Sequence, residues 1–328
     1  MKYFYSVFAL VFFAQASSLS AAENSLVFGD TVFVKRSSTT SSGLPFQSYL
    51  SFASESAPLL LFVQGSGCTP VFGGSEERGY YSTVFSVIPI ASQKVFNVMV
   101  VDKPYVPKDP LKNGGLSKGC PSKFIEEYSY EGWLDVLSHA YTDYRNLLKV
   151  KNLKGKNIGD LILGLSEGGS LAAGLAARHS TISDVALIGA SGTTQLFDML
   201  LRLHSTEDMS KLEHVMDRTA RLLGGQLEPD ELYRGHSNLR WSSFFAVDTA
   251  GELLRSQARV FILHGLADKS VPILSAESLY ARLFVAGRDV QFKRVPNAGH
   301  SLLSEGESFE TLAGYYQEIM DWYWVAKK

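Results

Sequence analysis

The hydrophobic pattern of the chain predicts buried strands that alternate with helices. Residues 58–63 read Pro-Leu-Leu-Leu-Phe-Val, an almost wholly apolar run. Such runs are typical of strands that are buried on both faces of a parallel sheet. Further strands are expected at residues 95–101, 160–165, 184–189, 259–263 and 290–295. Strands and helices in alternation indicate a mainly parallel sheet within three layers, an α/β fold.

Helical periodicity fills the intervals between these strands. Before the strand at 160–165, apolar residues recur at steps of four and three, which is the spacing of one helical face; they are Trp133, Leu137, Ala140, Tyr144 and Leu147. Helices are also expected at residues 170–178, 273–286 and 309–324.

Two segments before the first long helix depart from the alternation of buried strands and helices. Residues 25–35 and 46–52 are rich in aromatic and β-branched residues and are separated by the polar run 37–43, which predicts an opening hairpin of two strands. Residues 103–129 are rich in Pro, Gly and Lys, so we expect a long irregular loop there.

A helical cap is expected after the strand at 184–189, because the interval before the next strand is too long for a simple crossover. Residues 205–223 carry apolar side chains at helical steps, with Ser205 and Asp208 spaced as a capping pair. An aromatic-rich piece with Trp241 and Phe244 follows. We interpret approximately residues 192–255 as a cap inserted over the sheet.

Composition narrows the class of protein. Of the 328 residues, 45% are hydrophobic and 20% are charged, and the formal net charge is −2. These values are typical of one large globular domain. Without a basic cluster interleaved with aromatic residues, a nucleic-acid partner is not expected.

The N-terminus has the pattern of a secretory signal. Lys2 precedes the apolar segment 4–14, and the small residues Ser-Ala-Ala follow at 20–22. We therefore predict a signal peptide at 1–22 and a mature α/β domain at 23–328. This prediction implies an exported protein, periplasmic or secreted, without a stable membrane anchor after cleavage.

Two alternatives to this interpretation stay open. Residues 14–16 offer a second cleavage site, and the apolar segment could remain as an uncleaved anchor, although it falls short of the roughly 20 residues that span a bilayer. Export also bears on the two cysteines, Cys68 and Cys120. An even count in an oxidising compartment predicts one disulfide, with two free buried thiols as the alternative.

The candidate chemistry begins at residues 164–168, which read Gly-Leu-Ser-Glu-Gly between an apolar strand and a helix of small residues. A sharp turn of this kind strains the backbone of its central residue, and close glycines make room for it. The turn lifts the Ser166 hydroxyl clear of the sheet. Ser166 is therefore a candidate nucleophile.

Two further candidates follow later strands, Asp268 in His-Gly-Leu-Ala-Asp and His300 in Asn-Ala-Gly-His. Ligands bind at the carboxyl ends of parallel strands, so residues distant in sequence can converge there. A serine hydroxyl needs a base, which an imidazole can provide, and a carboxylate orients that imidazole. Taken separately, Asp268 could be a turn residue and His300 a surface histidine.

With these motifs the sequence resembles the α/β-hydrolase family over nearly all of the mature chain. The resemblance implies a three-layer α/β-hydrolase fold and a catalytic triad of Ser166, Asp268 and His300. It also implies an oxyanion hole formed by the backbone N–H of Glu167 and an N–H of residues 64–67. We favour the Ser66 N–H over its two glycine neighbours. Gln64 departs from the common His-Gly pair of the family at this place.

The side chain of Glu167 has two interpretations. It could favour the positive end of the following helix, or it could face the site and attract a substrate ammonium, as acidic residues do in some exopeptidases of this fold. Acidic residues of the cap would help in the second case or simply form a solvated helix face; they are Glu207, Asp208 and Glu213. His264 is expected to be structural. The histidines lack metal-ligand spacing, so we expect no metal, and no cofactor is implied.

We predict an exported serine hydrolase that forms an acyl-enzyme and cleaves a small-molecule carboxylic ester. The alternative within enzymes is a serine aminopeptidase-like peptidase that cleaves a peptide or amide. The alternative from another class is a non-catalytic binding protein on a hydrolase fold.

Overall fold

The computed structural model describes residues 24–75, 77, 79–84, 86–108, 115–150, 158–204 and 209–327. The predicted signal peptide with its alternative cleavage site lies outside this part of the chain, as do Ser205, Glu207 and Asp208. Among the described residues, no helix is both long enough and apolar enough to cross a membrane.

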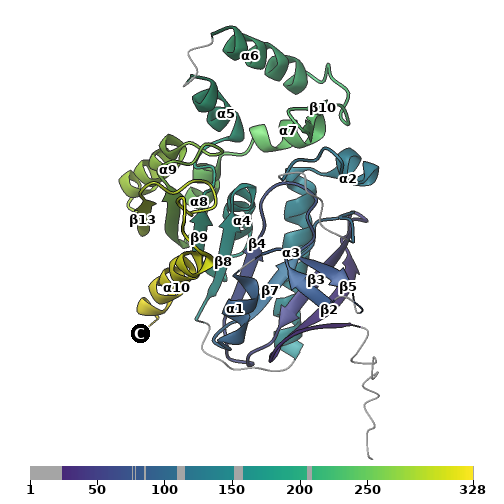
Figure 1. Ribbon diagram of the computed structural model, residues 1–328, viewed down its shortest axis with the longest axis vertical. Helices are drawn as coiled ribbons and strands as arrows, with labels where there is room; N and C mark the ends of the chain where they lie inside the picture. The colour runs from purple at the N-terminus through teal and green to yellow at the C-terminus, as the bar shows by residue number, and fades with distance from the viewer. Residues whose placement is uncertain are drawn as a thin grey trace, which may run out of the picture.

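A nine-stranded sheet in the order β1-β2-β3-β7-β4-β8-β9-β12-β13 forms the centre of the molecule (Figure 1). From β7 to β13 all neighbouring strands are parallel. This confirms the mainly parallel sheet. The six parallel strands lie where the apolar runs predicted them: β4 Leu59–Val63, β7 Asn97–Val101, β8 Asp160–Leu165, β9 Ile182–Ile188, β12 Arg259–Gly265 and β13 Val290–Val295.

The antiparallel edge differs from the predicted two-stranded hairpin. Residues 25–35 form two strands, β1 Ser25–Phe28 and β2 Thr31–Thr39, because the chain turns back at Gly29 with a φ of 58°. The polar run 37–43 is not all loop, since its first residues in β2 pair with β3 Pro45–Ser51. Ladder hydrogen bonds come from the backbone, so a polar sequence does not prevent pairing.

Alternate side chains of the strands enter two separate cores, which makes the fold three-layered. In β4, Leu59, Leu61 and Val63 join one core, and Leu60 and Phe62 join the other. The first core is covered by α3 Tyr130–Val150, α4 Glu167–Arg178, α8 Thr249–Arg255 and α9 Ile273–Val285. The second is covered by α1 Val87–Ser92 and α10 Phe309–Val325.

The stretch 103–129 is less irregular than predicted, because α2 Ser122–Glu127 forms within it. Just before this helix, Cys120 forms a disulfide with Cys68, with 5.9 Å between the two Cα atoms. The predicted disulfide is therefore confirmed. A small hairpin of β5 Phe72–Ser75 and β6 Gly79–Ser82 follows Cys68.

A layer of helices lies over one end of the sheet (Figure 1). It comprises α5 Gln195–His204, α6 Met209–Leu223, the short strands β10 Leu232–Tyr233 and β11 His236–Ser237, and α7 Asn238–Phe245. These helices share a small core of their own, built from Met199, Leu203, Val215, Leu222, Trp241 and Phe245. The name "cap" is used below for residues 195–245.

Removal of the disulfide should destabilise the protein without changing its fold. The two cysteines are 52 residues apart in sequence, and a link across such a loop contributes about 2–4 kcal/mol, mainly by restricting the unfolded chain. We expect the double variant Cys68→Ala, Cys120→Ala to lose about that much free energy of unfolding in urea titrations. A reductant should bring the wild type to the level of the double variant and leave the variant unchanged. Equal stabilities of the oxidised wild type and the variant would contradict this expectation.

Candidate active site

Ser166 sits in a strained turn between β8 and α4. Its φ is 54° and its ψ is −122°, a conformation that L-residues rarely adopt. Two glycines make the turn possible: a Cβ at Gly164 would lie 2.5 Å from the Gly168 oxygen, and one at Gly168 would lie 2.3 Å from the Val63 oxygen. The turn therefore has the geometry that the Gly-Leu-Ser-Glu-Gly pattern predicts.

A chain of hydrogen bonds joins the three predicted catalytic side chains. His300 Nε2 lies 3.0 Å from Ser166 Oγ, and His300 Nδ1 lies 2.7 Å from Asp268 Oδ2. Because the carboxylate can only accept, the proton belongs on Nδ1 and leaves Nε2 free to accept from the serine hydroxyl. The structure thus brings together residues from the ends of β8, β12 and β13.

Asp268 is held as a buried, ionised carboxylate. Its Oδ1 accepts hydrogen bonds from the backbone N–H groups of Ser270 at 2.7 Å and Val271 at 2.9 Å. Burial would raise the pKa of Asp268, but the hydrogen bond with His300, the charge of that ring and the backbone N–H of Val271 bring it below its ordinary value. His264 is buried beside it and bonds the Val271 carbonyl through Nε2, in agreement with a structural role.

The loop after β4 lies directly against Ser166. A Cβ built on Gly65 would come within 3.2 Å of the Ser166 Cβ, and one on Gly67 would meet the Gly115 backbone at 2.8 Å. Lys103 donates hydrogen bonds from Nζ to the carbonyl oxygens of Gly65 and Gly67. The segments that carry the two predicted oxyanion donors, Ser66 and Glu167, are therefore neighbours. Their role stays a prediction.

The Glu167 side chain has a partner set that neither sequence interpretation included. It is 4% exposed. Its Oε1 accepts from the Tyr128 hydroxyl, and its Oε2 accepts from Nε and Nη2 of Arg240. Lys103 Nζ lies 3.8 Å from Oε1. Burial would raise the pKa of Glu167, but Arg240, Lys103 and Tyr128 lower it to about 2.

Sequence analysis did not identify Lys103, Tyr128 or Arg240. The available signals were weak: a lysine just past an apolar strand and an arginine in an aromatic-rich segment.

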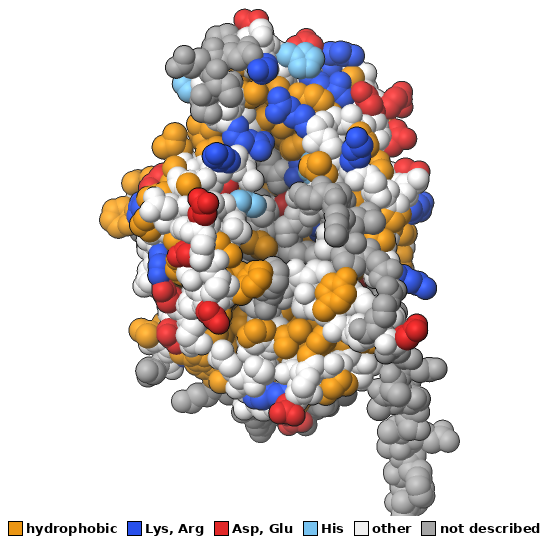
Figure 2. Space-filling view, in the orientation of Figure 1, with side chains coloured by type: hydrophobic (Ala, Val, Ile, Leu, Met, Phe, Trp, Pro, Cys, Tyr) orange, Lys and Arg blue, Asp and Glu red, His pale blue; other side chains and the backbone are white. Residues whose placement is uncertain are grey.

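A face of the molecule shows a hollow beneath the cap, with Lys and Arg side chains gathered above it (Figure 2). The basic character of this region is therefore a result of folding. It does not follow from a basic run in the sequence.

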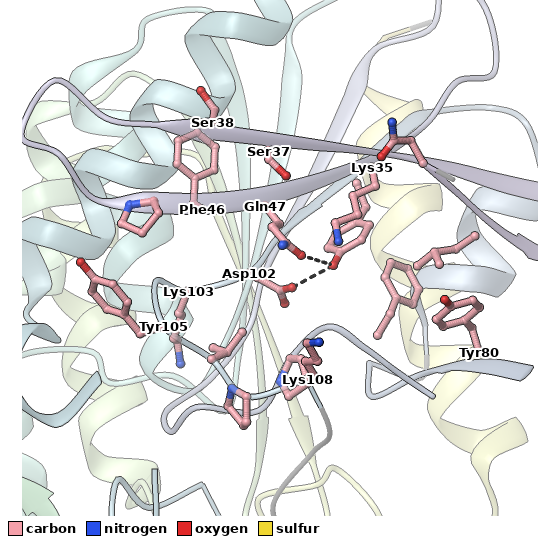
Figure 3. A pocket seen from close by; sticks show the side chains of 18 of the residues that line it. Lys35, Ser37, Ser38, Phe46, Gln47, Tyr80, Asp102, Lys103, Tyr105 and Lys108 are labelled. Atoms are coloured by element: carbon pink, nitrogen blue, oxygen red, sulfur yellow. Dashed lines mark hydrogen bonds between the residues drawn. The ribbon is translucent and has the colours of Figure 1, made fainter. Parts of the chain in front are cut away.

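A separate cavity of about 690 Å³ lies beside the antiparallel edge and has no triad residue in its lining. Asp102, labelled in Figure 3, lies in the wall of this cavity and accepts a hydrogen bond from the Tyr49 hydroxyl at 3.0 Å. Burial raises the pKa of Asp102 to about 6. Lys103 also borders this cavity, although its ammonium bonds the loop next to Ser166.

The profile of the prolyl oligopeptidase family matches residues 147–324, which contain all three predicted catalytic residues. The chain belongs to the prolyl oligopeptidase family. It is thus an α/β-hydrolase of the serine hydrolase type, and the family resemblance in the sequence is confirmed. No curated protein matches the full sequence significantly.

Solved structures support the fold at low sequence identity. Est1E from Butyrivibrio proteoclasticus is 15% identical with a TM-score of 0.53, over 88% of this chain and 99% of that chain. The α/β-hydrolase GrgF from Penicillium sp. sh18 is 12% identical with a TM-score of 0.56, over 89% and 98%. The acylaminoacyl peptidase of Pyrococcus horikoshii is 15% identical with a TM-score of 0.54, over 89% of this chain and 41% of that one.

The contact between Gly65 and Ser166 predicts an activity defect in Gly65→Ala. The added methyl group would press on the Ser166 Cβ at 3.2 Å, and displacement of a reacting group costs up to about 100-fold in rate. We expect kcat/KM for an ester substrate to fall about 10-fold to 100-fold. Gly314→Ala is the control, because Gly314 is exposed in α10 with open space around it. It should keep full activity, and a normal rate in Gly65→Ala would contradict the prediction.

The low pKa of Glu167 predicts a pH-dependent contribution to stability. A carboxylate with a folded-state pKa near 2 stabilises the fold fully above its ordinary pKa, and this stabilisation is lost as the pH falls through about 2. Glu167→Gln leaves Lys103 and Arg240 without their anion, so it should lower the free energy of unfolding at pH 7 by about 3–5 kcal/mol.

Urea titrations at pH 7, 4.5 and 3 would measure this effect. The deficit of Glu167→Gln should be largest at pH 7 and should shrink below pH 4.5. Glu213→Gln, an exposed position of α6, should stay within about 0.5 kcal/mol of wild type at each pH. A pH-independent deficit in Glu167→Gln would argue against an ionised Glu167.

Proposed function

We propose that this chain is an exported carboxylic ester hydrolase that works through an acyl-enzyme on Ser166. The observation that carries the proposal is the hydrogen-bond chain from Ser166 through His300 to Asp268, which starts at a strained elbow. A fold that had lost catalysis would not need to keep this arrangement. The intact chain therefore argues against a non-catalytic binding protein.

The proposed reaction has two halves. Ser166 Oγ attacks the ester carbonyl while His300 Nε2 takes its proton, and the C–O bond breaks as His300 gives that proton to the leaving alcohol. Water then attacks the acyl-enzyme with His300 as base and releases the acid. Asp268 stabilises the imidazolium in both halves. The N–H groups of Glu167 and Ser66 would stabilise the oxyanion.

The environment of Glu167 favours an ester over a peptide with a free amino terminus. A peptidase of the aminopeptidase type would need a carboxylate free to bind the substrate ammonium. Glu167 is buried and already bonded by Arg240 and Tyr128, so it does not offer one. Membership of the prolyl oligopeptidase family is the observation that keeps a peptidase as the second candidate.

Export is part of the proposal and is supported by two features. The N-terminal sequence has the pattern of a signal peptide, and the Cys68–Cys120 disulfide suits an oxidising compartment. Expression with and without residues 1–22, followed by fractionation of the cells, would test it.

Substrate class is tested with p-nitrophenyl esters of increasing chain length beside aminoacyl and prolyl p-nitroanilides. We expect the wild type to hydrolyse esters at a much higher kcat/KM than anilides. Ser166→Ala should lose at least about 10⁴-fold in kcat, and Asp268→Asn about 10³-fold to 10⁴-fold through the wrong histidine tautomer. A fluorophosphonate probe should label the wild type but not Ser166→Ala.

Other results would redirect the proposal. Faster turnover of the anilides would favour the peptidase, and the anilide series would then define its preferred residue. Absence of both turnover and probe labelling in correctly folded wild type would favour the binding protein.

A further inference from the structure

Three buried charges meet at the residue that follows the candidate nucleophile. Lys103, Glu167 and Arg240 have side chains that are only 1%, 2% and 4% exposed. They come from three separate parts of the fold: Lys103 follows β7, Glu167 begins α4, and Arg240 lies on α7 of the cap. These three residues are called the charge cluster below.

Lys103 fixes the orientation of the loop that carries one predicted oxyanion donor. Its Nζ donates to the Gly65 carbonyl oxygen, and also to that of Gly67 at 2.8 Å. The Gly65 carbonyl and the Ser66 N–H belong to the same peptide group, which is planar and trans, so they point in opposite directions. A carbonyl held toward Lys103 therefore directs the Ser66 N–H away from it. The hydrogen bond also polarises the peptide and strengthens its N–H as a donor.

Glu167 connects the second predicted donor to the same lysine. Its backbone N–H follows Ser166, and its carboxylate lies 3.8 Å from Lys103 Nζ. Tyr128 donates to the same oxygen of this carboxylate, Oε1, and Arg240 donates to the other oxygen, Oε2. The ammonium thus sits between the loop of the first donor and the side chain of the second.

Stability alone does not explain such a cluster. Desolvation of buried ion pairs costs about as much as their attraction returns, and well-packed apolar residues often stabilise a fold better. The cluster also holds two cations to one anion, and Nη1 of Arg240 is buried without a hydrogen-bond partner in the part of the chain that the structure describes. An arrangement that is costly for folding suggests a role in the site.

We propose that the charge cluster positions the oxyanion hole, with Lys103 aligning the Ser66 N–H, Glu167 anchoring Lys103, and Arg240 linking this alignment to the seating of α7. The inference rests on the proposed function and deepens it. Lys103, Glu167 through its side chain, and Arg240 are positioning residues, since they act through backbone donors. Movement of the cap would change the strength of the oxyanion hole.

Titration of Lys103 gives this arrangement a pH signature. Burial lowers the pKa of Lys103 to about 8, although Glu167 and Asp102 oppose the shift and Arg240 adds to it. Among the other titratable groups that face the cluster, Asp102 is ionised near pH 8, because its pKa is about 6. Tyr128 and His236 stay neutral there: burial raises the pKa of Tyr128 well above 10, and burial lowers that of His236 to about 3. Loss of the Lys103 charge weakens its hold on both carbonyls, so kcat should fall above about pH 8.

The decisive experiment compares Lys103→Met with a matched control. The control is Lys327→Met. Lys327 and Arg259 both form ion pairs with the buried Asp184, near the amino-terminal ends of the parallel strands and away from the site. Like Lys103→Met, this variant removes a lysine from a group of two cations and one carboxylate. Kinetics with a p-nitrophenyl ester, fluorophosphonate labelling and thermal unfolding are measured for each. Lys103→Met should lose about 10-fold to 100-fold in kcat with KM changed less than about threefold, because oxyanion contacts form in the transition state.

The controls separate positioning from stability. Lys327→Met should unfold at a lower temperature and keep its kcat, and Arg240→Lys, which retains the charge, should recover more kcat than Arg240→Met. The wild type should show an alkaline fall of kcat near pH 8 that Lys103→Met lacks. Normal kcat in folded Lys103→Met would overturn the inference while leaving the esterase intact. If Lys103→Met does not fold, a wild-type kcat that stays flat to pH 9.5 would overturn it.

Failure of the proposed function gives a different result. If the chain is a binding protein, neither the wild type nor Lys327→Met turns over an ester or reacts with the fluorophosphonate. If it is a peptidase, both proteins react with the probe and hydrolyse an anilide faster than an ester.

Discussion

The strained turn at Ser166 is the constraint on which the rest of the site depends. A φ of 54° at a serine is tolerated because the neighbouring glycines let β8, α4 and the end of β4 approach more closely than any side chain would allow. The turn aims the hydroxyl at His300, and it also places the Glu167 N–H at the start of α4. Both predicted functions of this segment, attack and oxyanion binding, come from one backbone conformation.

The parallel sheet supplies the partners of that turn. β8, β9, β12 and β13 run side by side in the same direction, so the loops after them meet at one edge. Asp268 is then fixed by the backbone N–H groups of its own turn, and it fixes His300 in turn. The strands thus set the positions of the triad side chains, while the cap contributes Arg240 from its helix α7.

Electrostatics explain how the acidic residue beside the nucleophile, Glu167, stays ionised in the interior. A carboxylate this deeply buried is stable only with cations and hydrogen-bond donors around it, and Arg240, Lys103 and Tyr128 fill that role. One cation of the cap, Arg240, is therefore directed inward, onto Glu167. This arrangement ties the cap, the sheet edge and the loop after β4 to one another through charge.

The sequence by itself determined the parallel strands, the elbow, and the loop positions of Ser166, Asp268 and His300 just past their strands. These features depend on local patterns, namely apolar runs, close glycines and turn residues at strand ends. It misjudged residues 25–35, where one glycine reverses the chain, and it missed α2 within 103–129. Only the tertiary structure decided the partners of Glu167, since Lys103 and Arg240 reach it from residues far away in the chain. Local patterns report burial and turns, whereas a buried ion pair is chosen by which distant elements the packing brings into contact.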